Sequence, residues 1–160
     1  MIKILTIDDM EEFYPIVAEV LCGKHFDFDN MEHVSWLKKK ISSFFSRGMV
    51  FFGLYYEEDP IGYAALDINE QPGFPNVKAE LHQIGIQNSL RRKSMGTMLL
   101  THVENYAREK GVYCMLMSTY AADYKVIAFY GKNGFVPVAT IPDVHGPGDE
   151  GIVYMRKILK

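Results

Sequence analysis

Apolar and polar positions alternate along the chain with two different periods. A period of two residues is typical of strands, and a period of about 3.6 residues is typical of helices. The first pattern, with turn residues at its boundaries, predicts seven strands at residues 2–7, 49–56, 61–68, 77–87, 113–118, 135–141 and 152–158. The second predicts four helices, one that follows Asp8 or Asp9 as far as Gly23 and three at residues 31–45, 95–110 and 121–132.

The order of these elements, β-α-α-β-β-β-α-β-α-β-β, predicts the fold class. The second and third strands are separated by a short acidic turn and are expected to form a hairpin. Residues 71–76 and 142–151 are rich in proline and glycine and are expected to be loops. We expect an α+β fold, a three-layer α/β/α-type sandwich around one mixed, twisted sheet. No repeat or long linker divides the chain, so a single domain over residues 1–160 is expected.

The composition narrows the class of protein. Hydrophobic residues make up 48% of the chain, enough for a packed core, and the net charge of −3 argues against general nucleic-acid affinity. No apolar stretch approaches the ~20 residues that span a bilayer, and the acidic start of the chain is unlike a signal peptide. Cys22 and Cys114 lack metal-binding spacing; two reduced thiols are expected, and a disulfide between them stays an alternative. We therefore expect a cytoplasmic protein without a metal site or a membrane partner.

A basic segment, Arg91-Arg92-Lys93-Ser94-Met95-Gly96-Thr97, lies between a predicted strand and the start of a predicted helix. Free backbone N–H groups and the helix dipole favour an anion at such a place, and three cations add to the effect. The spacing fits neither a P-loop nor a dinucleotide fingerprint. The pattern indicates a site for a phosphorylated cofactor, with a solvated basic helix start as the alternative.

Two motifs resemble those of the GNAT superfamily of acyl-CoA-dependent N-acyltransferases. The basic segment resembles the family's pyrophosphate loop, Q/R-x-x-G-x-G/A, with Ser94 in place of the first glycine. The block Ala128-Phe129-Tyr130-Gly131-Lys132-Asn133-Gly134-Phe135 resembles the family's helix end, although a plain helix C-cap would also explain Gly134 and Phe135. The motifs lie in the family's order about 40 residues apart, and the predicted element order is that of the family over nearly the whole chain.

The resemblance implies a GNAT-like sheet with a splay between the fourth and fifth strands, and acetyl-CoA as co-substrate. At Asp123 the family often has an asparagine that contacts pantetheine. Ser94 is strained if its position needs a positive φ, and unstrained if it is already helical. The implied cofactor contacts are Ile84, Ile86, Arg91, Arg92, Lys93, Ser94, Met95, Gly96, Thr97, Asp123 and Tyr130.

The resemblance also implies catalytic roles. Tyr130 corresponds to the family's proton donor for the departing thiolate, and Glu80 to the general base of histone-type members. A carboxylate needs a pKa raised by burial to act as a base at neutral pH, whereas His82 needs no shift and is the rival base. With strict alternation, Glu80 and His82 share a face with Ile84 and Ile86. Gly85 is expected at a bulge or a close approach.

The acceptor is expected to be a primary amine of a small molecule or peptide, attacked directly in a ternary complex. The alternative is a non-catalytic acyl-CoA-binding sensor of the same fold. A homodimer is left open, and no nucleic-acid partner is expected. Candidate acceptor contacts lie near the second helix and in the late loop: Phe26, Asp27, Phe28, Asp29, Glu32, His33, Asp143, His145, Asp149 and Glu150.

Overall fold

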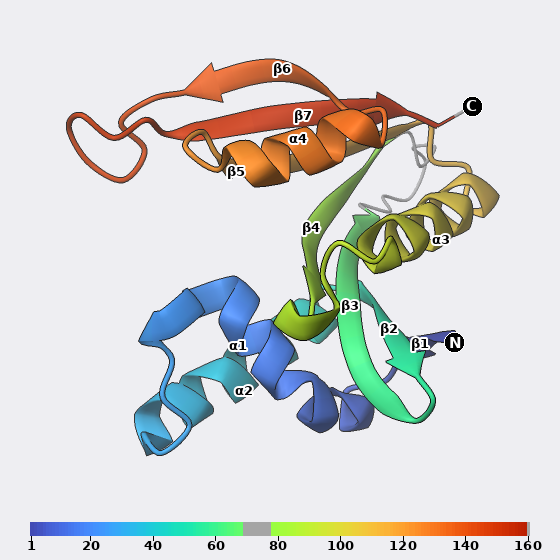
Figure 1. Cartoon of the computed structure of the whole chain (residues 1–160), viewed down its shortest axis with the longest axis vertical. Helices are drawn as coiled ribbons and strands as arrows, with labels where there is room; N and C mark the ends of the chain where they lie inside the picture. Colours follow the sequence, from blue (N-terminus) through green and yellow to red (C-terminus); the bar gives the residue numbers. More distant parts are fainter. Residues whose placement is uncertain (69–77, 160) are drawn as a thin grey trace.

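The computed structural model describes residues 1–68 and 78–159, and its strands form one mixed sheet (Figure 1). The order of strands across the sheet is β1-β2-β3-β4-β5-β7-β6. The strands are β1 (Ile2–Leu5), β2 (Val50–Tyr56), β3 (Asp59–Ile68), β4 (Lys78–Ile86), β5 (Cys114–Tyr120), β6 (Val136–Ile141) and β7 (Ile152–Ile158). The α-helices are α1 (Tyr14–Cys22), α2 (Met31–Ser46), α3 (Met95–Glu109) and α4 (Tyr124–Lys132). The short 3-10 helices are η1 (Asp8–Phe13), η2 (Gly23–His25) and η3 (Asn88–Leu90).

The core is divided between the two faces of the sheet. Side chains of α1 and α2 pack with residues of β2 and β3 in one cluster. Side chains of α3 and α4 pack against the opposite face in a second cluster, which also includes β5 and β7. Figure 1 shows the same arrangement, with α1 and α2 on one side of the strands and α4 beside β5 and β7. The predicted three-layer sandwich is therefore confirmed.

The predicted splay between the fourth and fifth strands is present. β4 and β5 are parallel, and among the described residues they pair only from Lys78 opposite Cys114 to Glu80 opposite Leu116. Beyond that point the two strands diverge (Figure 1), while β5 continues to pair with β7 as far as Tyr120. Backbone groups of β4 after Glu80 and of β5 after Leu116 thus face a gap in the strand pairing.

A bulge in β4 changes which side chains share a face. Gln83 lies opposite Ala65 and Leu81 opposite Leu66, so His82 is the extra residue. The predicted face of Glu80, His82, Ile84 and Ile86 is therefore wrong. Leu81, Ile84 and Ile86 face α3, whereas His82 contacts Phe44 of α2. Of the two alternatives for Gly85, a bulge or a close approach, the close approach applies, because a Cβ there would lie 2.5 Å from Val20 Cγ2.

Two helix predictions also need correction. Asp8 and Asp9 do not cap α1, because this stretch forms η1 and Asp9 accepts hydrogen bonds from Thr6 instead. For α3, the apolar period from residue 95 to residue 107 predicts a buried face that includes Met98 and His102, and the observed face differs. Met98 is 46% exposed, whereas Leu100 and Glu104 are buried. Glu104 tolerates burial because its carboxylate accepts two hydrogen bonds of 2.7 Å from Lys157 of β7.

The hairpin of β2 and β3 is confirmed, with Tyr56 opposite Asp59. The expected loop at 71–76 and the predicted start of β4 at residue 77 lie outside the described residues. No helix of the described residues is long and apolar enough to cross a membrane.

Candidate functional site

The loop that precedes α3 has an unusual backbone. Arg92 and Ser94 both have left-handed conformations, with φ of 63° and 62°. Ser94 directly precedes α3, and its side chain makes no capping hydrogen bond. Of the two alternatives for Ser94, the strained one applies, since a residue with a Cβ disfavours this region. The loop keeps the turn that the family pattern assigns to glycine.

Arg91, the first cation of the loop, forms hydrogen bonds to other groups of the protein. Arg91 Nε donates to the carbonyl oxygen of Ile86 at 2.9 Å, and Nη2 donates to Oε1 of Glu19 at 2.7 Å. Asn88 donates to the same Glu19 oxygen at 2.7 Å. Sequence reasoning missed Glu19, because nothing in a helical acid reveals a contact 72 residues away. The side chains of Arg92 and Lys93 are exposed, so two cations remain available to an anion in solvent.

Gly96 lies where α3 and α4 meet. A Cβ at this position would lie 3.3 Å from ring atoms of Phe129 and 3.8 Å from Cγ1 of Ile86. Its φ is not in the left-handed region, so the glycine permits close packing rather than a turn. Met95 is half-buried and Thr97 exposed at the same helix start. The predicted cofactor contacts of the loop therefore adjoin Ile86 on β4 and Phe129 on α4.

Tyr130 is buried near the end of α4, where only 4% of it is exposed. Its ring makes edge contacts with Phe129 at 5.2 Å and Phe135 at 5.3 Å between centroids. Burial raises the pKa of the Tyr130 phenol above its ordinary value near 10. The hydroxyl is thus protonated throughout the neutral range, as a proton donor must be.

The two candidate bases have different surroundings. Glu80 is the last residue of β4 that pairs with β5, at the apex of the splay, and its side chain is exposed. The burial that the base role required of Glu80 is absent. His82 is half-buried, and its ring lies 5.1 Å from that of Phe44. Its Nδ1 is buried and has no hydrogen-bond partner among residues 1–68 and 78–159. Burial lowers the pKa of His82, which favours the neutral imidazole.

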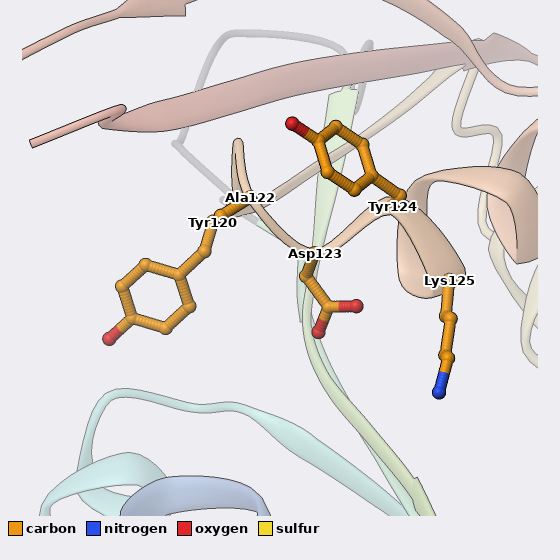
Figure 2. A pocket seen from close by; sticks show the side chains of 5 residues that line it. All are labelled: Tyr120, Ala122, Asp123, Tyr124 and Lys125. Atoms are coloured by element: carbon orange, nitrogen blue, oxygen red, sulfur yellow. The ribbon is translucent and has the colours of Figure 1, made fainter.

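A hollow of about 430 Å³ lies between the end of β5 and the start of α4. Its lining residues are Tyr120, Ala122, Asp123, Tyr124 and Lys125. Figure 2 shows the side chains of Tyr120, Asp123 and Lys125 directed to one side of the connecting loop and that of Tyr124 to the other. Asp123 is the N-cap of α4 and accepts a hydrogen bond from Val126 N at 3.2 Å. Sequence reasoning singled out Asp123 but missed the two tyrosines, although exposed aromatics at a turn are a usable signal.

The candidate acceptor residues form two separate groups. Near α2, the Phe26 ring contacts Phe28 and His33, and the backbone N–H of Asp27 donates to Nδ1 of His33. In the β6–β7 loop, Asp143 and Asp149 accept hydrogen bonds from backbone N–H groups of that loop. Many of the polar side chains in these two groups therefore form hydrogen bonds that stabilise their own loops. One contact crosses to the hollow, since the His145 ring lies 5.2 Å from that of Tyr120. Within the part of the chain that the structure describes, no side-chain contact places Glu32 or Glu150 in the site.

The splayed sheet, the loop before α3 and the buried tyrosine on α4 together match one known family. The model of the acetyltransferase (GNAT) family matches residues 10–135. The chain belongs to this family. The resemblance drawn from the two motifs is thus confirmed, while the role of each site residue stays a prediction.

The names of two relatives state different acceptors, a tRNA cytidine and spermidine. Over 88 residues, the chain is 38% identical to tRNA(Met) cytidine acetyltransferase TmcA of Aeropyrum pernix, covering 55% of this chain and only 12% of that enzyme. It is 24% identical to spermidine N(1)-acetyltransferase of Thermoplasma acidophilum over 84% of this chain and 86% of that one. A solved structure of PaiA N-acetyltransferase from the same organism, in complex with coenzyme A, has a TM-score of 0.71, 22% identity and 99% coverage of both chains. At that identity the structural likeness establishes the fold.

Proposed function

We propose that this protein transfers an acetyl group from acetyl-CoA to a primary amine of a small molecule or peptide. The observation that carries the proposal is the position of Tyr130, a buried and protonated phenol on the helix that flanks the splay. Family membership and a relative that binds coenzyme A support acetyl-CoA as co-substrate. Among the relatives, the spermidine enzyme supports a small amine, because its match extends over most of both chains.

Acetyl-CoA is proposed to bind along the splay, with its phosphates at the loop before α3. Exposed Arg92 and Lys93 supply positive charge, and the start of α3 supplies free N–H groups. Ile84 and Ile86 lie on the part of β4 that pairs with β3 and has left β5, so its edge toward β5 can pair with the pantetheine as with another strand. Asp123 lies at the far side of the splay, at the start of α4.

The proposed chemistry is a direct attack. The lone pair of the neutral amine forms a bond to the thioester carbonyl carbon, and the carbon–sulfur bond breaks with its electron pair on sulfur. Tyr130 gives its proton to the departing thiolate, and the proton of the amine passes to a base. Burial and the neutral imidazole support His82 as that base. Glu80 is supported by its own position at the point where β4 and β5 separate.

Thiol release from acetyl-CoA with a panel of amines tests the function. The panel contains alkyl monoamines, diamines, spermidine, amino acids, aminoglycosides and peptides with a free N-terminus. Amine-dependent thiol release with a matching acetylated product is expected for the enzyme. Tight acetyl-CoA binding without release for any member would favour the sensor alternative. The cytoplasmic location, the homodimer and the absence of a nucleic-acid partner stay predictions.

A further inference from the structure

The bulge in β4 places two consecutive polar residues on one face of the sheet. Gln83 lies opposite Ala65, which belongs to the core cluster of α1 and α2, and His82 contacts Phe44 of α2. In a regular strand two neighbouring residues would face opposite sides of the sheet. Gln83 also lies beyond Glu80, on the part of β4 that has left β5. It therefore borders the splay on the same face as the candidate base His82.

A buried tyrosine holds the amide of Gln83 in one orientation. Gln83 is only 7% exposed and Tyr63 is fully buried, and the Tyr63 hydroxyl donates to Oε1 of Gln83 at 2.7 Å. Burial raises the pKa of Tyr63 well above its ordinary value, so the phenol keeps its proton. Within residues 1–68 and 78–159 this hydroxyl has no other acceptor, and a buried donor needs one. The amide oxygen is therefore committed to Tyr63, and the amide nitrogen is left for another partner.

The absence of a side chain at Gly85 makes room for this contact. Gly85 lies opposite Tyr63, and a Cβ at Gly85 would lie 3.2 Å from Cε1 of the tyrosine ring. The ring also lies nearly parallel to that of Phe51, with 6.4 Å between the centroids. Tyr63 is thus packed in one position, and the amide that it binds is fixed with it.

The nitrogen of the same amide is free to bind a ligand. In the part of the chain that the structure describes, Nε2 of Gln83 donates to no group, and it is not among the atoms sealed from solvent without a partner. Its N–H groups can only donate, and donation to the attacking amine would occupy the lone pair that must react. Among the reacting atoms, the thioester carbonyl oxygen is the one that gains negative charge when the amine adds.

We propose that Gln83 is a further catalytic residue, whose amide N–H donates to the thioester carbonyl oxygen. This inference rests on the proposed acetyl transfer. As the carbon–nitrogen bond forms, the π electron pair of the carbonyl moves onto oxygen, and it returns when the carbon–sulfur bond breaks; the N–H stabilises the charge in between. Tyr63 acts through Gln83 and is a positioning residue. Tyr130 belongs to the core cluster on the opposite face, so the oxyanion and the departing sulfur are served from different sides of the sheet.

A single and a double variant separate catalysis from packing. Gln83→Met keeps the approximate volume and removes the amide, and the double variant with Tyr63→Phe also removes the phenol that would otherwise lack an acceptor. Loss of one oxyanion donor should lower kcat about 10²-fold in both proteins. The Kd of acetyl-CoA and the KM of the amine should stay within about threefold of the parental values.

Two further variants complete the set. Tyr63→Phe alone should lower kcat about three- to tenfold, because the amide keeps its donors but loses its fixed orientation. Gln87→Met makes the same change one residue after β4, where the side chain is exposed, and should leave kcat unchanged. Urea unfolding of each variant shows that kcat is measured on folded protein.

The infrared band of the carbonyl of bound, isotopically labelled acetyl-CoA gives a readout that does not depend on turnover. A hydrogen bond to the oxygen weakens the C=O bond, so Gln83→Met should move the band to higher frequency and Gln87→Met should not. Parental kcat in the double variant would assign Gln83 to packing alone and overturn the inference. An unmoved band, or a loss of turnover confined to acceptors that carry an oxygen, would also overturn it and leave acetyl transfer standing. Absence of transfer to every amine by the parent overturns the proposed function, and the inference falls with it.

Discussion

Arg91 reaches across to Glu19, with Nη2 and Oε1 separated by 2.7 Å. The contact joins the loop before α3 to helix α1, on the other face of the sheet. With its Nε bonded to the carbonyl of Ile86, the guanidinium fixes the loop rather than extending into solvent. Arg91 therefore differs from Lys93, whose exposed side chain is free to meet a phosphate.

Arg91 and Glu19 should act as a unit in acetyl-CoA binding. Arg91→Ala and Glu19→Gln each release the loop, so each should weaken affinity about two- to fivefold, a modest effect because the pair is partly exposed. The double variant should be no weaker than the worse single variant. Lys93→Ala should lower the salt dependence of binding and add to the effect of Glu19→Gln. Calorimetry at two salt concentrations measures the parent, the three single variants and the two double variants, and strict additivity of Arg91→Ala with Glu19→Gln would contradict the coupling.

Ser94 has a φ of 62°, a conformation that glycine adopts without strain. Ser94→Gly should raise the free energy of unfolding by up to about 1 kcal/mol, the relief of strain being partly offset by the greater freedom of the unfolded chain. Ser94→Val should lower it, because a β-branched residue tolerates this region worst. Urea unfolding measures both changes. Equal stability of the glycine and valine variants would show that the turn relaxes around the residue.

Much of the fold could be predicted because strands and helices differ in apolar period. The order of elements and the splay followed from the pattern and the two motifs. The bulge could not be predicted, because alternation through Leu81, His82 and Gln83 gives no sign that His82 is the extra residue. One inserted residue changes the face of what precedes it, which is why the predicted companions of Glu80 were wrong.

Site residues that belong to a local sequence motif could be predicted. Site residues that depend on a partner far away in the sequence could not. Gly96 and Tyr130 belong to sequence motifs. Glu19 does not, and the hollow at Tyr120 lies on β5 beyond Leu116, where β5 no longer pairs with β4. Contacts between elements far apart in sequence depend on packing, which local patterns do not encode.

Tyr130→Phe should lower turnover and spare cofactor binding. Loss of a general acid typically lowers kcat about 10²- to 10⁴-fold, and the phenyl ring keeps its contacts with Phe129 and Phe135. Since burial raises the pKa of Tyr130 above its usual range, the parent should lose no activity through ionisation of this group below about pH 10. Steady-state kinetics against pH, with calorimetry for acetyl-CoA, provide the measurement. Turnover of the variant within about twofold of the parent would remove Tyr130 from the mechanism.

The pH dependence of kcat/KM distinguishes His82 from Glu80 as base. Burial lowers the pKa of His82, with Arg47 and Lys40 acting in the same direction and Glu80 and Asp67 opposing it. If His82 is the base, activity should fall only at a pH below the ordinary histidine value of about 6.5, and His82→Gln should abolish this acidic limb. Glu80→Gln removes a charge that favours imidazolium, so it should shift the limb to lower pH without abolishing it. If Glu80 is the base, the two outcomes exchange, and a limb that neither substitution moves would mean that the amine arrives deprotonated or loses its proton to solvent.

The same titration affects folding, so the kinetic test needs a stability control. The pKa of His82 is lower in the folded protein than in the unfolded chain, so the unfolded state binds more protons in the interval between the two values. The stability that neutral His82 contributes is present above about pH 6.5, the unfolded value, and is lost as the pH falls through the folded value. His82→Gln should flatten this loss, and Glu80→Gln, which lowers the folded pKa of His82 further, should enlarge it, in urea unfolding at pH 7.5 and 5.5. An acidic limb that disappears in His82→Gln at pH values where the parent is still fully folded reports proton transfer, whereas a limb that follows the unfolding curve of the parent would assign His82 to stability alone.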